Sequence, residues 1–137
     1  MRDPKLSVAG AAALANGLGD ALSNGYLRIY DDTGVVPGTA DEGNGANVLL
    51  AELRLATPAA PPTVTQALTL SAITADASAN ASGTPAYARY YKSDGVTCLF
   101  QGRCGVADDS DFILNDTTVA AGGIVSCSAA TLTVPLS

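Results

Sequence analysis

The residues from Thr84 to Gly105 carry the clearest alternation of side chains in the chain. The first half of this stretch places two tyrosines and an arginine on one face of a strand: Tyr87, Arg89 and Tyr91. Gly95 follows where a tight turn needs a positive φ, and residues 96–103 then return with a second alternating run. The pattern therefore predicts an antiparallel hairpin at the centre of a sheet.

A different period, close to that of an α-helix, runs from Leu6 to Leu22. Three leucines recur at intervals of four residues and share one helix face: Leu14, Leu18 and Leu22. Ser7 is a suitable cap for the start of this helix, and Asn24-Gly25 is a common left-handed stop. We expect one N-terminal helix that packs on the sheet through its leucine face.

Short apolar or alternating runs predict six further strands: residues 26–30, 48–55, 68–73, 112–114, 124–127 and 130–134. With the hairpin they make about eight short strands, at the spacing typical of antiparallel β-sandwiches. We therefore predict a mainly β fold in a single domain, residues 1–137. An N-terminal arm and helix occupy residues 1–24, and the sandwich occupies residues 25–137.

The charge balance narrows the class of partner. Seven basic residues stand against thirteen acidic ones, and the net charge is −6, so no basic stripe exists to follow a nucleic acid. The apolar run 6–22 is too polar to span a bilayer and lacks the flanks of a signal peptide. We expect neither nucleic acid nor membrane as a partner, and synthesis in a cytoplasm.

The residue types needed for catalysis are mostly missing. The chain has no histidine, which excludes Ser-His-Asp and Cys-His nucleophilic arrangements. Neither Gly-x-Gly run follows a strand and opens a helix, as phosphate binding requires. We expect no enzyme activity, no cofactor and no metal site. Calcium binding by the acidic loop Asp108–Asp111 stays open, because Asp-x-Asp supplies oxygen ligands but the closing glutamate is missing.

The three cysteines have two interpretations. Free cysteines are often buried and act as small apolar side chains, and this interpretation applies to Cys98, Cys104 and Cys127 alike. The alternative is a Cys104–Cys127 disulfide, or a bond to a neighbouring subunit, although a reducing cytoplasm opposes both.

By elimination, we expect this chain to work through buried side chains and protein contacts, and not through catalysis. Three parts are the expected carriers of contact: the N-terminal arm with Met1, Arg2 and Leu6, the loop 31–47 with Val35 and Val36, and the face of Tyr87, Arg89 and Tyr91. Tyrosine and arginine are enriched at protein interfaces. Ordinary packing inside the sandwich is the alternative for that face.

Five segments in this order resemble a family of small tailed-bacteriophage virion structural proteins of the capsid decoration (cement) type. The segments are GYLRIYD (25–31), LLAELRL (49–55), SGTPAYARYYKSDG (82–95), FQGRCG (100–105) and FILNDTTVAAG (112–122). The resemblance implies a non-enzymatic protein on the virion that binds the major capsid protein lattice, braces it and forms homo-oligomers. The sequence departs from the family at the three cysteines, where small or valine-like residues are usual.

Two other classes stay open. A tail or head–tail connector component is also a β-sandwich assembly protein, and copy number in the virion distinguishes it from a decoration protein. A carbohydrate-binding module is disfavoured because the chain has no tryptophan and two phenylalanines.

Overall fold

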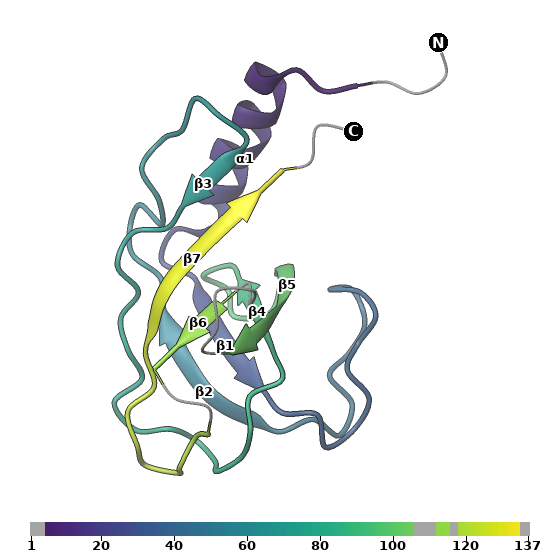
Figure 1. The fold of residues 1–137 in the computed structure, drawn as a ribbon, viewed down its shortest axis with the longest axis vertical. Helices are drawn as coiled ribbons and strands as arrows, with labels where there is room; N and C mark the ends of the chain where they lie inside the picture. Colours follow the sequence, from purple (N-terminus) through teal and green to yellow (C-terminus); the bar gives the residue numbers. More distant parts are fainter. Residues whose placement is uncertain (1–4, 106–111, 116–117, 135–137) are drawn as a thin grey trace.

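The fold is described from a computed structural model, and the described residues are 5–105, 112–115 and 118–134. The chain begins with one helix, α1 (Val8–Leu22), and continues, within these residues, as seven strands (Figure 1). The strands are β1 (Tyr26–Tyr30), β2 (Leu49–Arg54), β3 (Ala67–Thr69), β4 (Tyr87–Tyr91), β5 (Cys98–Gly105), β6 (Phe112–Leu114) and β7 (Cys127–Thr133). The prediction of a mainly β protein with an N-terminal helix is confirmed.

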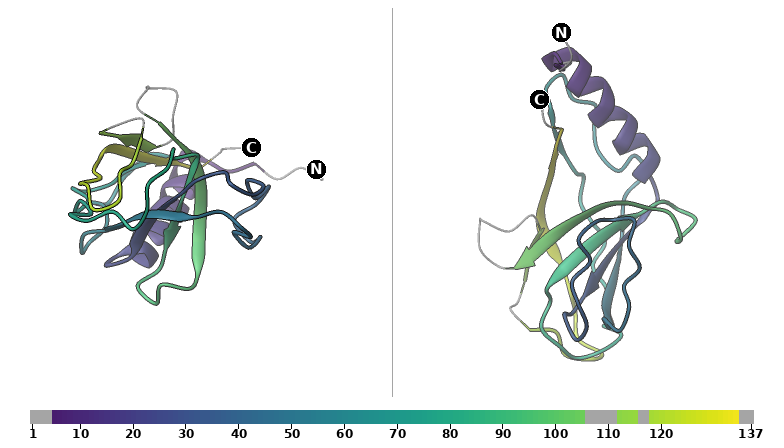
Figure 2. Two further views of the ribbon diagram at one scale, coloured as in Figure 1. Left: turned by 90° about the horizontal axis from the view of Figure 1, so that it is seen from below. Right: turned by 90° about the vertical axis from the view of Figure 1, so that its right-hand side faces the viewer.

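The strands are hydrogen-bonded in the order β2-β1-β4-β5-β6-β7-β3. The first four are antiparallel, β5 and β6 are parallel, and the remaining pairs are antiparallel. The two ends of this order enclose one core, because Leu27, Leu53 and Tyr90 of the first four strands belong to the same buried cluster as Leu68 and Leu132 of β3 and β7. The layout is therefore sandwich-like, as Figures 1 and 2 show.

The strand count differs from the prediction at the C-terminal end. Residues 124–127 and 130–134 were expected as two strands, but most of this stretch forms the one strand β7. The intervening residues, Ser128 and Ala129, include no glycine, proline or asparagine, so nothing in the local sequence forces a turn. Before β7, Val125 makes only an isolated bridge with Asp76.

The third predicted strand, 68–73, is also shorter in the structure and ends at Thr69. Beyond it the Ser71 amide donates to the carbonyl of Ala59 instead of continuing the ladder. Leu70 and Ile73 nevertheless pack against the core. The apolar pattern therefore identified the side chains that are buried, but not the backbone pairing.

Both predicted ends of α1 are confirmed. The Ser7 hydroxyl accepts from the Gly10 amide at 3.0 Å, and Asn24 has the positive φ of a left-handed stop, 59°. Gly25 then turns into β1, where an added Cβ would lie 2.2 Å from the Tyr91 carbonyl oxygen. The helix can therefore end so close to the sheet only with glycine at this position.

The packing face of α1 differs from the predicted leucine face. Leu22 is fully buried and Leu18 is half-buried, but Leu14 is 55% exposed. The buried face consists mainly of small residues: Ala11, Ala12, Ala15 and Gly19. A Cβ at Gly19 would lie 3.1 Å from Leu68 of β3, so the missing side chain lets helix and strand approach closely. Packing distance, rather than side-chain size, selects this face.

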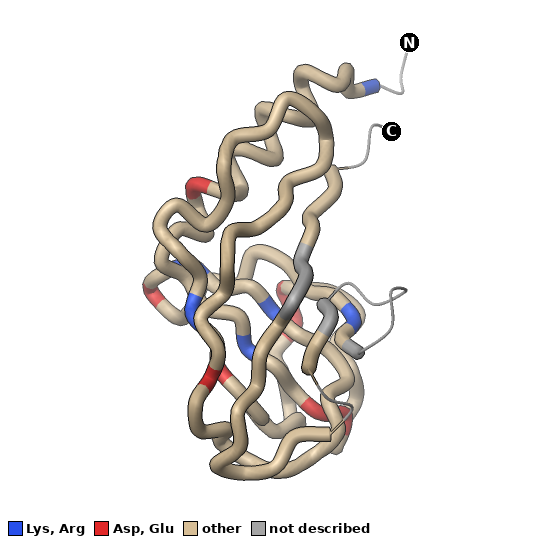
Figure 3. Tube along the Cα trace, turned by 60° about the vertical axis from the view of Figure 1, so that its left-hand side comes forward, with Lys and Arg blue, Asp and Glu red and all other residues tan. Residues whose placement is uncertain are grey.

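Charge is distributed unevenly along the molecule (Figure 3). We define the uncharged end as α1, β3 with its flanking residues 55–70, and β7, whose last residues pair with β3 toward this end of the molecule while its first residues pair with β6 (Figure 2). Within residues 6–22, 55–70 and 127–134 the one charged residue is Asp20. Four large apolar side chains at or beside this end are exposed: Leu6, Val8, Leu14 and Val64.

Candidate contact surface

The outer face of the four-stranded half carries a ladder of tyrosines and arginines. We call it the tyrosine–arginine face, and it consists of Tyr26, Arg28 and Tyr30 of β1 with Tyr87, Arg89 and Tyr91 of β4. Alternation along each strand puts these side chains on one side, opposite the core residues Leu27, Ile29, Ala88 and Tyr90. The register pairs Tyr26 with Tyr91, Arg28 with Arg89 and Tyr30 with Tyr87. Tyr30 and Tyr87 stack with ring centroids 5.2 Å apart.

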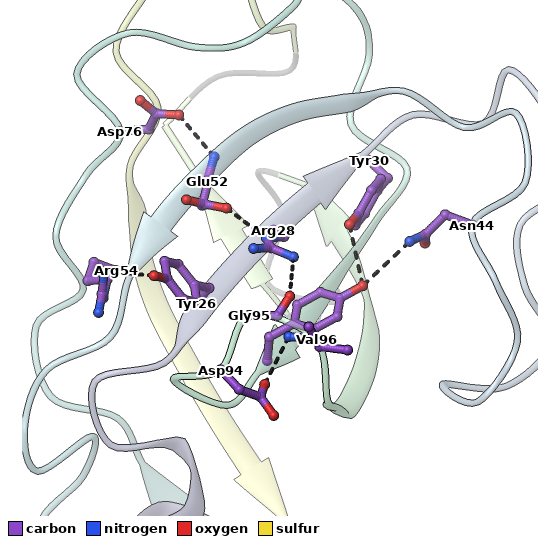
Figure 4. A network of polar contacts seen from close by, with 11 residues as sticks. Tyr26, Arg28, Tyr30, Asn44, Glu52, Arg54, Asp76, Asp94, Gly95 and Val96 are labelled. Atoms are coloured by element: carbon purple, nitrogen blue, oxygen red, sulfur yellow. Dashed lines mark hydrogen bonds and ion pairs between the residues drawn. The ribbon is translucent and has the colours of Figure 1, made fainter.

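Two arginines directly opposite each other would repel, yet Arg28 and Arg89 face one another across the ladder. Their side chains take separate partners. Arg28 Nε lies 2.7 Å from Glu52 Oε2, and its Nη1 donates to the Gly95 carbonyl at 2.7 Å (Figure 4). The Arg28 guanidinium also lies 4.7 Å from the centre of the Tyr91 ring. Burial alone would lower the pKa of Arg28, but Glu52 outweighs it and raises that pKa.

The loop between β1 and β2, residues 31–47, lies across the tyrosine–arginine face as a strap. The strap is closed at its base by Asp31, whose carboxylate accepts from the Val48 amide at 2.7 Å and from Thr33. The hydrogen bond from the Thr33 hydroxyl and the bond from Val48 hold the pKa of Asp31 below its ordinary value. Each end of the strap is therefore fixed to the other before the chain enters β2.

Two asparagines attach the middle of the strap to the tyrosines beneath it. The Asn47 side chain accepts from the Gly34 amide at 2.7 Å and donates to the Val35 carbonyl and the Tyr87 hydroxyl. The Asn44 side chain accepts from the Tyr87 hydroxyl at 2.7 Å and donates to the Tyr91 hydroxyl at 3.4 Å. Side-chain amides, rather than a backbone ladder, thus hold the strap on the sheet.

Carbonyl groups of the strap complete the attachment. Arg89 donates through Nη2 to the Thr39 carbonyl at 3.2 Å and through Nε to Gln101 Oε1 at 2.9 Å. Gln101 in turn donates to the Pro37 carbonyl at 2.7 Å. Arg89 is 3% exposed, and Tyr87 and Tyr91 are 2% and 6% exposed.

This burial bears on the two interpretations of the Tyr87, Arg89 and Tyr91 face. The chain's own strap covers these three side chains, so they are not presented to a partner in this structure, and the packing interpretation fits. Val35 and Val36 of the strap are instead 87% and 43% exposed. Leu6 is 38% exposed, and Met1 and Arg2 lie outside the described residues.

The strap leaves a hollow on either side of it. The apolar hollow, about 320 Å³, lies between Val36 and Ala86, Tyr87 and residues 101–103. The polar hollow, about 400 Å³, lies between strap residues 40–44 and the hairpin, where Arg89, Tyr91 and residues 96–98 line it. Exposed Val36 and Val96 flank the two hollows.

Cys98, Cys104 and Cys127 form no disulfide in the structure. Cys104 and Cys127 are buried in the core, and burial raises the pKa of Cys104 to about 12. Cys98 is half-buried in the wall of the polar hollow, and burial raises its pKa as well. The small-apolar interpretation fits this placement, and the alternative Cys104–Cys127 disulfide is not formed.

Residues 5–105, 112–115 and 118–134 contain neither a cluster of metal-ligand side chains nor a helix of membrane-spanning length and apolarity. Among those residues no group of three or more histidine, cysteine or acidic side chains is placed to hold a metal ion. The acidic loop Asp108–Asp111 lies outside them. No helix in the described part of the chain is long and apolar enough to cross a membrane.

Sequence reasoning missed Asn44, Asn47 and Gln101, which hold the strap in place. Their only local signal is two asparagines in a glycine-rich loop, which predicts turns rather than contacts with tyrosines some forty residues away.

Comparisons with family models, curated proteins and solved structures found no match to this chain.

Proposed function

We propose that this chain is a non-enzymatic structural protein of a bacteriophage particle, which decorates the capsid and stabilises it by binding the major capsid protein lattice. The observation that supports the proposal best is the uncharged end. Large apolar side chains gathered on a surface with few charges are typical of protein contact sites. Leu6, Val8, Leu14 and Val64 are exposed at or beside an end that has one charged residue.

The geometry also agrees with a role in contact rather than catalysis. Among the described residues the buried polar groups of the tyrosine–arginine face have partners within the fold, and they hold a loop in place. The resemblance of five ordered segments to capsid decoration proteins supports the choice of the major capsid protein lattice as the partner. In that role the uncharged end packs on capsid subunits or on further copies of the chain, and the acidic body faces water.

The test is co-sedimentation of the purified chain with particles of the bacteriophage that encodes it, together with its copy number in those particles. A decoration protein is present in on the order of hundreds of copies, whereas a ring-shaped connector or tail component is present in about six or twelve. Particles that lack the chain should break at lower temperature. Absence of the chain from purified particles would overturn the proposal.

A matched pair of variants locates the contact. Leu14→Glu adds a charge to the uncharged end at a site 55% exposed, so we expect it to abolish co-sedimentation and leave the fold intact. Ile124→Glu makes the same change at a residue 67% exposed, in the β6–β7 connection at the opposite end (Figure 1). This control should sediment with particles as the unaltered chain does. Equal binding by both variants would show that the uncharged end is not the contact.

A further inference from the structure

Arg89 is a buried cation whose hydrogen-bond partners among the described residues are neutral. Its guanidinium donates to the side-chain oxygen of Gln101 and to the carbonyl of Thr39, and it lies 5.9 Å from the centre of the Tyr87 ring. Burial alone would raise the pKa of Tyr91, but hydrogen bonds with Tyr30 and Asn44 and the nearby Arg89 lower it. None of these acceptors carries a full negative charge, although a guanidinium removed from water is best stabilised by a carboxylate.

Arg89 is also one of the residues that line the polar hollow, which opens beside the strap. A guanidinium has five N–H donors in a fixed plane, and the named partners do not use them all. A hollow of about 400 Å³ has room for one side chain or a small acid, and it is near the lower end of the range for ligand sites. We propose that the polar hollow is a binding site for a carboxylate group, which pairs with Arg89.

Two acidic residues of the strap line the hollow and shape its selectivity. Glu42 is engaged with the strap itself, because its Oε2 accepts from the Gly38 amide at 3.0 Å. Asp41 is exposed, and its charge contributes to the raised pKa of Cys98 in the hollow wall. Asp41 therefore opposes an incoming anion, so that a singly charged carboxylate is favoured over a phosphate with its higher charge.

The carboxylate that fits the proposed function is an acidic side chain of a partner protein, and only this choice of source depends on that function. Buried arginine–carboxylate pairs at the centre of an interface contribute strongly to specificity. Val96, which is 81% exposed, lies at the hollow and offers an apolar contact next to the charge. A small free carboxylate would use the same guanidinium without that contact.

The experiment follows the Arg89 Nε–H signal by NMR in the full chain, because burial and the bond to Gln101 slow its exchange with water. The probes are sodium acetate, the peptide acetyl-Gly-Glu-Gly-amide and sodium phosphate, each at constant ionic strength. We expect a saturable shift with acetate and with the peptide. Stronger binding of phosphate than of acetate, or a shift that never saturates, would overturn the carboxylate assignment.

Three variants test whether carboxylate binding depends on the charges of Arg89 and Asp41. Arg89→Gln should weaken binding at least about tenfold, because the charge and the planar donor pair are both lost. Asp41→Asn should tighten binding about twofold to fivefold by removing a like charge at an exposed position. Arg54→Gln removes an exposed arginine that contacts Tyr26 outside the hollow, and it should leave binding unchanged. If Arg89→Gln fails to fold, the Asp41→Asn result still decides: unchanged or weaker binding contradicts the proposal.

The probes also separate the source of the carboxylate. Tighter binding of the peptide than of acetate supports an acidic protein side chain, and equal binding overturns that source while leaving the site. Because acetate binding needs no capsid, a chain that binds acetate but not phage particles would overturn the proposed function alone. A chain that sediments with particles but binds no carboxylate would overturn this inference alone.

Discussion

Single residues at the tip of the hairpin show how one carboxylate can define a turn. Asp94 Oδ1 accepts from the Val96 and Thr97 amides, both at 2.9 Å, and Oδ2 accepts from the Thr97 hydroxyl at 2.7 Å. Gly95 between them has φ of 72°, as the sequence predicted. The carboxylate thus replaces backbone hydrogen bonds that the turn leaves unmade.

This arrangement predicts the titration of Asp94. The backbone bonds from Thr97 and Val96 and the Thr97 hydroxyl lower its pKa to about 2. Because the unfolded value is about 4, the stabilisation is complete above about pH 4 and is lost as the pH falls to about 2. A carboxyl NMR titration should show this low pKa, and Thr97→Val should raise it. An ordinary pKa in the unaltered chain would contradict the turn geometry.

Two glycines provide a matched test of close packing. At Gly25 an added Cβ would lie 2.2 Å from the Tyr91 oxygen and 2.8 Å from the Leu22 oxygen, and neither is a flexible side chain. Gly25→Ala should therefore cost about 2 to 4 kcal/mol in the free energy of unfolding. Gly17 has nothing within 4 Å on an exposed helix position, so Gly17→Ala should stabilise the protein by about 0.5 to 1 kcal/mol. Urea unfolding measures the free energy of unfolding of both variants. Equal effects would contradict the close packing described at Gly25.

At the scale of elements, the strap depends on very few groups. Asn47 is 9% exposed and joins Gly34, Val35 and Tyr87 through one amide. We expect Asn47→Ala to destabilise the protein by about 2 kcal/mol, since buried donors and acceptors lose their partners. Amide hydrogen exchange should quicken in residues 34–44 and stay slow in β1 and β4.

Asp32→Ala is the control for this prediction because Asp32 is exposed in the same loop. It should change the free energy of unfolding by less than about 0.5 kcal/mol. Faster exchange throughout β4 in the Asn47 variant would mean that the strap and the sheet open together, contrary to an attachment made by side chains.

Elements whose signals are local in the sequence were predicted correctly, and contacts between distant elements were not. The hairpin, both helix caps and the turn at Gly95 were predicted because their signals lie within a few residues of each other. The packing face of α1 was wrong at Leu14, since the choice of face depends on Leu68 approaching Gly19 from a distant strand. The strap over the tyrosine–arginine face was not predicted for the same reason: its anchors are far apart in sequence.

At the scale of the whole molecule, buried tyrosines predict sensitivity to alkali. Burial raises the pKa of Tyr90, and burial with the hydrogen bond to Tyr91 raises the pKa of Tyr30. When the pKa of a tyrosine is higher in the folded state than in the unfolded state, folding favours the neutral phenol. The contribution of these phenols to the free energy of unfolding is therefore complete below about pH 10 and is lost as the pH rises further. The urea midpoint should fall above about pH 10, and less steeply in Tyr30→Phe. A midpoint independent of pH in that range would contradict the burial.

The uncharged end has a consequence for behaviour in bulk solution. Residues 26–116 contain five basic and eleven acidic residues and so carry the entire net charge of −6. The molecule is therefore built like a detergent, with an anionic head and a neutral, partly apolar tail. In dilute buffer, repulsion between heads keeps molecules apart, and at about 0.15 M salt that repulsion reaches only about 8 Å. Salt should then drive association through the tails, so that the ionic strength of the medium sets the balance between single molecules and clusters.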